Sequence, residues 1–326
     1  MKIKSLFAAI GMTAMTLSSI TASANEKIDT SNIHFLIPGG PGGGWDGTAR
    51  GTGDALLKSK MIEHASFQNM SGGGGGKAIA YMIETAAKQT DTLMVNSTPI
   101  VIRSLTGVFP QSFRDLKPVA GTIADFGAFV VRSDSKYTDW EQVISDFKAN
   151  PRKVKFAGGS TRGSTDHLAA ALAVKIAGGN PRRLAYIAYD AGGKAMAGLL
   201  SGETALLSTG LSEAITMADS GEVRILAITS EKRVAAAPNV PTLVEMGYDV
   251  KFANWRGFFA APSMPDVKVK ALADKLGALN KTPEWQAIRD RNGWVDLYHG
   301  DTQFYKFLEE QEVVLGDLMR ELGFLK

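Results

Sequence analysis

Short apolar runs alternate with helical patterns over the first hundred residues. The runs at 34–38, 64–70 and 92–97 predict strands, and apolar residues recur at helical spacing near 46–59 and 77–87. Strands and helices that alternate in this way indicate a largely parallel sheet covered on both faces. We therefore expect this stretch to form one α/β unit.

The pattern changes after residue 116. Two strand-like runs, at about 117–123 and 127–132, follow each other without a helix, which would let the chain step from one sheet to another. The alternation then resumes and predicts a second α/β unit. Its helices are expected near 138–149, 164–177, 191–200 and 211–219, and its strands at 153–159, 184–190, 204–208 and 223–230.

The remaining residues predict a return to the first unit. Residues 237–262 end in a strand-like run and can serve as the return crossing, and only helical patterns follow, near 266–279, 283–291 and 301–322. In the last of these, apolar residues on one helical face should dock on the first unit. They are Phe304, Leu308, Leu315, Leu318 and Leu322.

These patterns predict an α/β protein with two lobes, two mixed sheets and two crossing strands. We assign residues 25–124 and 253–326 to lobe 1 and residues 125–252 to lobe 2. Ligands of open α/β sheets bind outside the carboxyl ends of the strands. We therefore expect a ligand cleft between the lobes, with a hinge at the crossings that can close it.

The first 24 residues have the pattern of a cleavable secretory signal. Lys2 and Lys4 precede an apolar run, and Ala22-Ser23-Ala24 follows it, so cleavage is expected after Ala24. The run is shorter than the roughly 20 residues that a membrane span needs, which makes a retained anchor the less favoured reading. We therefore expect a periplasmic protein.

Composition excludes several kinds of site. Without the two lysines of the signal, the 36 basic and 33 acidic residues leave a formal charge of +1, too little for a concentrated nucleic-acid surface. The absence of cysteine excludes disulfides, thiolate metal sites and a cysteine nucleophile. The four histidines lack the spacing of a zinc site, so we expect neither a metal nor a cofactor.

Two glycine-rich segments resemble nucleotide-binding motifs. Gly42, Gly44 and Gly47 match a dinucleotide fingerprint, but Gln-Asn-Met at 68–70 stands where that motif requires an acidic residue. Segment 71–78 resembles a phosphate-binding loop but lacks its first glycine and its final hydroxyl residue. This segment, with its five consecutive glycines, is either a flexible turn or a loop that lines the cleft.

The loops before the predicted helices are rich in glycine and hydroxyl residues, which suits a carboxylate ligand. The start of a helix offers unpaired N–H donors and about half a positive charge, and Ser or Thr adds a directional donor. Several helix starts that converge on one cleft would hold a small acid. The predicted ligand-binding residues are Gly42, Gly43, Gly44, Trp45, Asp46, Gly73, Ser97, Thr98, Ser160, Thr161, Arg162, Gly163, Ser164, Thr165, Tyr189 and Asp190.

Some candidates have a second interpretation as helix caps. Ser164, Thr165 and Asp166 stand where a helix begins, so they could cap it, contact the ligand or do both. The simplest role for Asp46 is to cap a helix that starts at Gly47, although it could also anchor waters or accept a ligand hydroxyl.

Bulky and cationic side chains near the cleft are also candidates. Trp45 either forms a wall of the cleft or packs inside a lobe. Arg162 is the best placed guanidinium for a second carboxylate of the ligand, because its planar fork donates to two oxygens at once. Arg50 and Arg256 are weaker candidates that could equally be partners in surface ion pairs.

Five short segments, taken in their order along the chain, form a recognisable sequence pattern. They are PGGPGGGWDGTAR at 38–50, NSTP at 96–99, GGSTRGSTDHLAAA at 158–171, AYDAGGKAMAGLLSGE at 188–203 and PNVPTLVEMGY at 238–248. With these segments, nearly the whole chain after the predicted signal resembles the periplasmic receptors of tripartite tricarboxylate transporters, the TctC or Bug family.

The resemblance implies a type II periplasmic binding-protein fold that captures small carboxylates and delivers them to a membrane permease. It also implies that backbone amides, hydroxyls and ordered waters from the loops at 42–46 and 160–165 hold a carboxylate. The extra Pro41 and glycine in the first loop depart from the commoner family pattern, which leaves the identity of the ligand open.

We therefore predict a monomeric receptor, not an enzyme, for a di- or tricarboxylate such as citrate or a C4 or C5 dicarboxylate. A receptor that signals to a sensor kinase is an alternative with the same ligand and another partner. An exported hydrolase is a further alternative, because His167 lies near Ser164 and Asp166. Neighbours on one helix point in different directions, however, and a catalytic triad must converge from separate elements.

Overall fold

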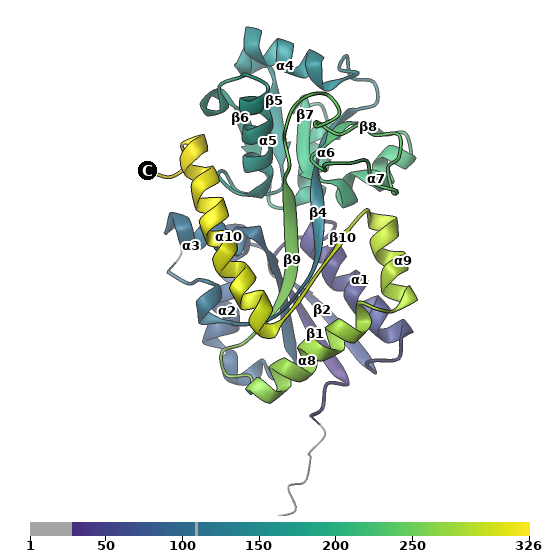
Figure 1. Ribbon diagram of the computed structural model, residues 1–326, viewed down its shortest axis with the longest axis vertical. Coiled ribbons are helices and arrows are strands. Elements are labelled where there is room, and N and C mark those ends of the chain that lie inside the picture. Colours follow the sequence, from purple (N-terminus) through teal and green to yellow (C-terminus); the bar gives the residue numbers. More distant parts are fainter. Residues whose placement is uncertain (1–27, 108–109) are drawn as a thin grey trace, which may run out of the picture.

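The computed structural model describes residues 28–107 and 110–326, so the predicted signal at 1–24 lies outside the described residues. The described chain forms two α/β parts stacked end to end (Figure 1). We call them the lower and the upper part, as they stand in Figure 1. The lower part contains the first strands and also the C-terminal helices.

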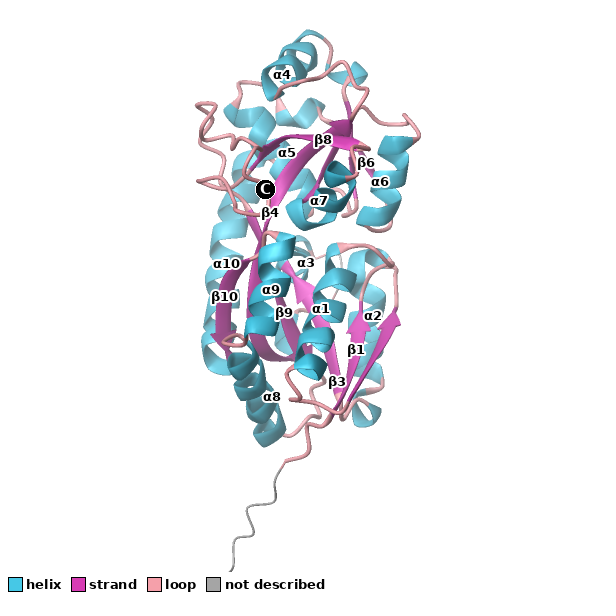
Figure 2. Cartoon of the chain, turned by 90° about the vertical axis from the view of Figure 1, so that its right-hand side faces the viewer, coloured by secondary structure: helices cyan, strands magenta, loops and turns pink. Residues whose placement is uncertain are grey.

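Three parallel strands begin the lower part. β1 lies between β2 and β3, as the alternating pattern predicts. Every residue of β3 is buried, because helices cover both faces of the sheet (Figure 2). The elements are β1 (Asn32–Ile37), α1 (Gly44–Lys58), β2 (His64–Asn69), α2 (Gly76–Glu84), β3 (Thr92–Ser97) and α3 (Thr98–Thr106).

The second alternating series forms the upper part. β5 pairs in parallel with β6 and β7. Helix α7 has the predicted bounds, and the other helices of this series begin one or two residues later than predicted and end within one residue of the predicted end. The elements are α4 (Trp140–Ala149), β5 (Lys155–Gly158), α5 (Thr165–Ile176), β6 (Ala185–Ala188), α6 (Gly192–Leu200), β7 (Leu206–Gly210), α7 (Leu211–Asp219) and β8 (Val223–Ile228).

One long strand, β4 (Lys117–Arg132), runs from the lower into the upper part beside β9 (Ala253–Ala260) (Figure 1). The sequence predicted two strands here. Residues 124–126 instead stay extended because they pair with residues 253–255 of β9. β4 then pairs with β7 and β8. The two expected sheets are therefore joined into one ten-stranded sheet, in the order β2-β1-β3-β9-β4-β7-β5-β6 with β8 and β10 also on β4.

The C-terminal segment contains a strand that the sequence analysis missed. Its elements are α8 (Asp266–Leu279), α9 (Pro283–Asn292), β10 (Val295–Gly300) and α10 (Asp301–Leu322). The predicted bounds of α8 and α10 match these. The expectation that only helices follow β9 is wrong, because β10 pairs antiparallel with β4. Six residues carry too few alternations to predict a strand without that partner.

Helix α10 lies along both parts (Figure 1). Its buried face includes Phe304 and Leu308, which pack with the lower part as the pattern predicts. The C-terminal end continues onto α5 of the upper part, where Lys175 pairs with Glu321 and the ring of Phe324 meets that of His167. The expected docking on the first unit alone is thus incomplete.

The core lies on both faces of the lower sheet. Phe35 and Val95 belong to a cluster with α1, α8 and α9, whereas Leu36 and Met94 belong to one with α2, α3 and α10. Adjacent strand residues thus point to opposite faces and are buried on both. Between residues 28 and 326, leaving aside 108 and 109, no helix has the length and apolar character that crossing a membrane requires.

Candidate functional site

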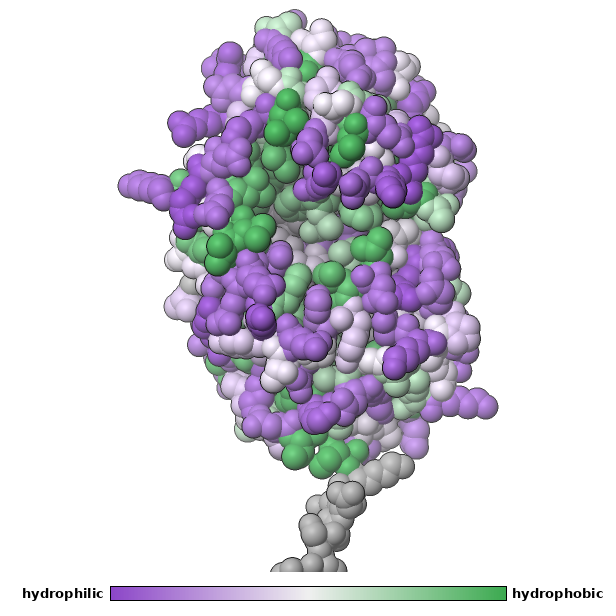
Figure 3. All heavy atoms as spheres, viewed as in Figure 1, coloured by the Kyte–Doolittle hydropathy of each residue, from purple (hydrophilic) through white to green (hydrophobic). Residues whose placement is uncertain are grey.

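A cavity of about 90 Å³ lies where the lower and upper parts meet. On the side of the molecule that faces the viewer in Figure 1, the space-filling view in Figure 3 shows a hollow between the two parts. Loops after β1, β3, β5 and β6 form the cavity with the first turns of α1, α3, α5 and α6. The lining residues are Pro38, Gly39, Gly40, Gly43, Gly44, Trp45, Gly74, Ser97, Pro99, Gly159, Ser160, Thr161, Ser164, Thr165, Asp166, Asp190, Ala191, Gly192, Glu213, Asn254 and Arg256.

Nine of the sixteen predicted ligand-binding residues line this cavity. They are Gly43, Gly44, Trp45, Ser97, Ser160, Thr161, Ser164, Thr165 and Asp190. The other seven lie outside its wall, and they are Gly42, Asp46, Gly73, Thr98, Arg162, Gly163 and Tyr189. That any of the sixteen binds a ligand stays a prediction, but their convergence on one cavity follows from the strand-then-helix pattern.

The first turn of α1 presents free donors to the cavity. The helix begins at Gly44, Gly43 is its N-cap residue, and no side chain caps it. The first N–H groups of a helix have no partner within it, so these amides are available to an anion. Gly42, with φ at +76°, makes the turn that leads into this helix.

Asp46 does not cap a helix at Gly47, as the sequence suggested, because α1 starts three residues earlier. Its carboxylate instead accepts the N–H of Gly42 at 3.1 Å and pairs with Arg50 at 2.9 Å. Asn69 donates to the same carboxylate at 3.0 Å. Asp46 therefore holds the glycine loop from behind the cavity.

Trp45 forms a wall of the cavity, and its indole Nε1 donates to Ser97 Oγ at 2.9 Å. The five-glycine segment packs beside this ring and supplies Gly74 to the cavity wall. Gly74 has φ at +55°, and a Cβ there would lie 2.9 Å from Cγ2 of Thr161 in the upper part. The glycine run thus lets the two parts approach closely, which favours the cleft-lining interpretation over a flexible turn.

The upper part contributes five of its eight predicted residues to the cavity wall, whereas Arg162, Gly163 and Tyr189 lie outside it. Arg162 donates to the carbonyl of Tyr186 at 3.1 Å and lines a separate cavity, so its expected role toward a second ligand carboxylate stays a prediction. Tyr189 donates to Glu203 at 2.6 Å. The two parts touch at the rim, where Ser71 donates to Asp190 at 2.6 Å.

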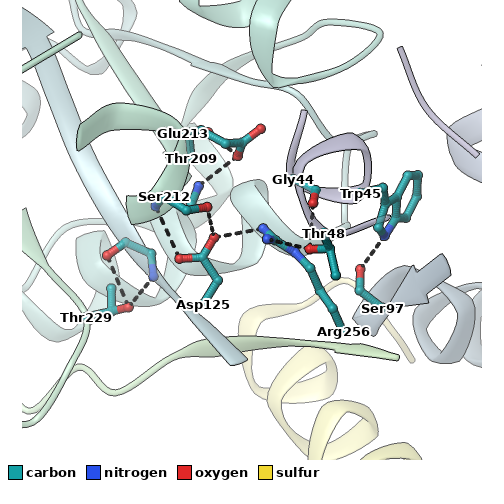
Figure 4. A network of polar contacts seen from close by, with 12 residues as sticks. Gly44, Trp45, Thr48, Ser97, Asp125, Thr209, Ser212, Glu213, Thr229 and Arg256 are labelled. Atoms are coloured by element: carbon teal, nitrogen blue, oxygen red, sulfur yellow. Dashed lines mark hydrogen bonds and ion pairs between the residues drawn. The ribbon is translucent and has the colours of Figure 1, made fainter. Parts of the chain in front are cut away.

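A buried ion pair forms the base of the cavity (Figure 4). Arg256 of β9 lies 2.8 Å from Asp125 of β4, and their side chains are 2% and 0% exposed. Arg256 also donates to Thr48 of α1 at 3.2 Å, while Ser212 of α7 donates to Asp125 at 2.5 Å. The network therefore links a helix of the lower part to one of the upper part. The sequence ranked Arg256 low and missed Asp125, a lone acid inside an apolar strand.

Three acidic residues line the upper wall: Asp166 of α5, Asp190 of the β6–α6 loop and Glu213 of α7. Glu213 accepts from Thr209 Oγ1 at 2.7 Å and from the N–H of Gly210 at 3.1 Å. Burial raises the pKa of Asp166 to about 7, with a further contribution from the negative charge of Glu213. Burial also raises the pKa of Glu213, and the positive charge of Arg256 opposes that shift.

The raised pKa of Asp166 predicts a pH-dependent stability. Its folded pKa of about 7 exceeds the ordinary value of about 3.9, so the folded protein loses stability as the pH rises between these values. We expect Asp166→Asn to be about as stable as the unmodified protein near pH 4 and more stable near pH 8. Urea unfolding of both proteins across this range measures the difference. A difference that does not change with pH would contradict the assignment.

The hydrolase alternative finds no support in the described geometry. Nδ1 of His167 accepts the N–H of Gly163 at 2.9 Å, and its ring stacks on Tyr186 outside the cavity. Burial lowers the pKa of His167 to about 4, with a contribution from Arg162. None of the four histidines lines the cavity. The described residues also hold no group of three His, Asp or Glu side chains suited to a metal ion.

Comparison with known proteins gives one matching family model. The model of the tripartite tricarboxylate transporter family receptor, TctC, matches residues 56–324. The match spans most of the chain and includes four of the five segments singled out in the sequence.

Three solved structures share the fold. The periplasmic binding protein BugD has a TM-score of 0.78 at 21% identity, covering 90% of this chain and 97% of its own. Rpa4515 of R. palustris, solved with adipate, has a TM-score of 0.80 at 21% identity, with coverage of 90% and 97%. MatC of Rhodopseudomonas palustris, with bound malate, has a TM-score of 0.75 at 18% identity, with coverage of 88% and 98%. The predicted periplasmic binding-protein fold is confirmed.

Proposed function

Because this chain belongs to the tripartite tricarboxylate transporter receptor family, TctC, we propose that its cavity captures a small carboxylic acid for a membrane permease. The resemblance to TctC and Bug receptors predicted from the sequence is confirmed. The family is one of solute-binding proteins, so the prediction that the chain is not an enzyme is also confirmed.

The uncapped first turn of α1 is the observation that carries this proposal. Its free amides face the cavity beside the hydroxyls of Ser97, Ser160 and Ser164. Backbone N–H groups at a helix start, aided by the helix dipole, favour a negatively charged group. A ligand carboxylate bound here would need neither a metal nor an arginine.

The remaining steps of transport are part of the same proposal. The predicted signal at 1–24 would export the chain to the periplasm, where the receptor would work as a monomer. The lobes, at 25–124 with 253–326 and at 125–252, would close on the ligand about β4 and β9. Closure requires ligand contacts with both lobes, because a ligand shifts an equilibrium only by its differential affinity. Delivery to a sensor kinase stays an alternative to delivery to a permease.

The first ligands to test are dicarboxylates and tricarboxylates, because related structures contain malate and adipate. We expect the matching acid to raise the melting temperature of the protein without its signal. At a free concentration of 100 times Kd, binding adds about 2.7 kcal/mol to stability. Differential scanning fluorimetry with citrate, succinate, malate, 2-oxoglutarate, adipate and simple monocarboxylates measures the shift. A response to a sugar and to no carboxylic acid would contradict the proposal.

A further inference from the structure

Acidic side chains of the protein line the upper wall of the cavity, where the sequence analysis expected a carboxylate of the ligand. Asp166 lies against the β5–α5 loop, where its N–H donates to Ser160 Oγ at 2.9 Å, and hydrogen bonding from the backbone of Gly159 and Ser160 and from the Ser160 hydroxyl opposes the rise in the pKa of its carboxyl. These are donors of the β5–α5 loop that the sequence analysis assigned to the ligand. An acidic side chain of the protein therefore stands beside these donors and lines the same cavity.

Glu213 is a second acidic side chain that lies beside a helix start. Its Oε2 accepts from Thr209 and Gly210, and its carboxyl carbon lies 2.8 Å from where a Cβ on Gly192 would stand. Gly192 is the first residue of α6, so the Glu213 carboxyl packs against the start of that helix. Both helix starts of the upper wall, α5 and α6, thus lie beside an acid of the protein.

The starts of α5 and α6 also lack a side-chain cap, but the lower wall, unlike the upper one, has no acidic residue among those that line the cavity. No side chain caps α1, and the glycines around its first turn leave amide N–H groups uncovered. Among the described residues that line the cavity, the single cationic side chain is that of Arg256, and it pairs with Asp125. The cavity therefore offers donors on its lower wall and acceptors on its upper wall.

Two unpartnered polar atoms lie near the acids of the upper wall. Asn254 Oδ1 and Thr165 Oγ1 are buried without a hydrogen-bond partner among the described residues, and Thr165 is only 5% exposed. Both residues line the cavity, and both also line a smaller cavity of about 30 Å³ beside it, with Asp166 and Glu213. Buried polar atoms in native proteins are nearly always paired, so these atoms point to a missing partner. An amide oxygen such as Asn254 Oδ1 requires a donor.

We propose that the cavity selects an acid whose carboxylate faces α1 and whose other end carries a hydrogen-bond donor, an amine or a hydroxyl, facing Asp166, Glu213 and Asn254. This inference rests on the proposed function and narrows it. A second carboxylate at the acceptor end would face Asp166 and Glu213, and Arg256, the one cationic side chain among the described residues of the cavity wall, is already paired with Asp125. Like charges in contact discriminate against such a ligand. An amine or a hydroxyl would satisfy the same groups.

The pH dependence of binding distinguishes a ligand amine at the upper wall from a ligand carboxylate at the same place. Asp166 faces Glu213 from α7, Tyr186 from β6 and Arg256 from β9, and Asp190 lies on the same cavity wall. An amine binds best to ionised carboxylates, so its affinity should rise between about pH 6 and pH 8, the range in which Asp166 loses its proton. A ligand carboxylate that instead accepts a hydrogen bond from protonated Asp166 would bind more weakly as the pH rises.

Isothermal titration calorimetry with matched linear acids tests the proposal. At each chain length from three to six carbons, the terminal group is varied among amine, hydroxyl, carboxylate and methyl on the same carboxylic acid. We expect the amine or the hydroxyl member to bind at least tenfold tighter than the dicarboxylate of the best length, and comparison of these two identifies the donor. For an amine, we also expect the affinity to rise with pH.

Single-residue variants identify the side chains that bind the hydrogen-bond donor of the ligand. Asp166→Asn and, separately, Glu213→Gln should reduce binding of the amine at least tenfold and bring it close to that of the dicarboxylate. Asp219→Asn is the matched control, because it neutralises an exposed acid on the same helix as Glu213. Circular dichroism and melting temperatures establish that each variant is folded.

Two other outcomes are possible, and each contradicts a different claim. In the first, dicarboxylates bind at least as tightly as the amine and hydroxyl acids, and Asp166→Asn leaves their affinity unchanged or improves it. This result would contradict the selection of a donor but not the proposed function as a carboxylate receptor. No binding of any acid in the series or in the dicarboxylate and tricarboxylate panel would overturn both the donor selection and the proposed function.

Discussion

Replacing Asp125 with alanine is expected to lower the free energy of unfolding by about 3–5 kcal/mol, the largest effect of any single change considered for this protein. Asp125 and Arg256 are almost completely buried, and removal of the acid leaves the guanidinium without its counter-charge. Ser212 would also lose its acceptor. The loss should appear in urea unfolding at neutral pH as a lower midpoint with little change in slope.

A double variant distinguishes the charge from the packing. Asp125→Leu combined with Arg256→Met removes both charges and keeps apolar volume, so it should recover a large part of the lost stability, as for other buried pairs. Lys270→Ala breaks the exposed pair with Asp274 and serves as the control, for which we expect little change. If Asp125→Ala were no more harmful than this control, the buried pair would have no structural importance.

Replacing Gly44 with alanine is expected to weaken ligand binding by about ten- to a hundredfold, since overpacking costs roughly 1–3 kcal/mol. A Cβ at Gly44 would lie 2.6 Å from Cζ of Arg256. The guanidinium cannot simply move aside, because Asp125 and Thr48 hold it. The first turn of α1, whose amides face the cavity, would shift instead.

Gly47 provides a matched control one turn further along α1. A Cβ at Gly47 would meet no atom within 4 Å, and Gly47 does not line the cavity. Gly47→Ala should therefore bind normally and gain up to about 1 kcal/mol of stability from the better helix propensity of alanine. Calorimetry with the ligand found in the panel and thermal unfolding compare the two variants. Equal binding by both would show that the clash at Gly44 does not reach the site.

Much of the fold could be predicted because apolar runs and helical periods are local signals. The bounds of α7, α8 and α10 follow from such periods, and β3 from a run that is buried on both faces. The continuity of β4 and the presence of β10 could not be predicted in this way. Each depends on a partner strand distant in sequence, β9 for the middle of β4 and β4 for β10.

The site was predictable where backbone geometry creates it and not where side chains do. Glycine before a helix indicated the donors at Gly43 and Gly44. The direction of Arg162 depends on a carbonyl of a neighbouring strand, and the role of Glu213 depends on the turns that bring α7 to the start of α6. Neither contact leaves a pattern in the sequence. The acidic upper wall was therefore missed, although Asp166 itself stood in a segment marked as important.

The paired strands β4 and β9 both run between the lower and upper parts and lie side by side, and α10 also extends along both parts. A change in the angle between the parts must therefore flex these two strands, and points far from them on either side would be displaced most. The chain contains no cysteine, so thiols introduced at exposed Glu141 of α4 and Val267 of α8 would be the sole sites of dye attachment. Energy transfer between two such dyes would report a change in the distance between the two parts when the solute binds.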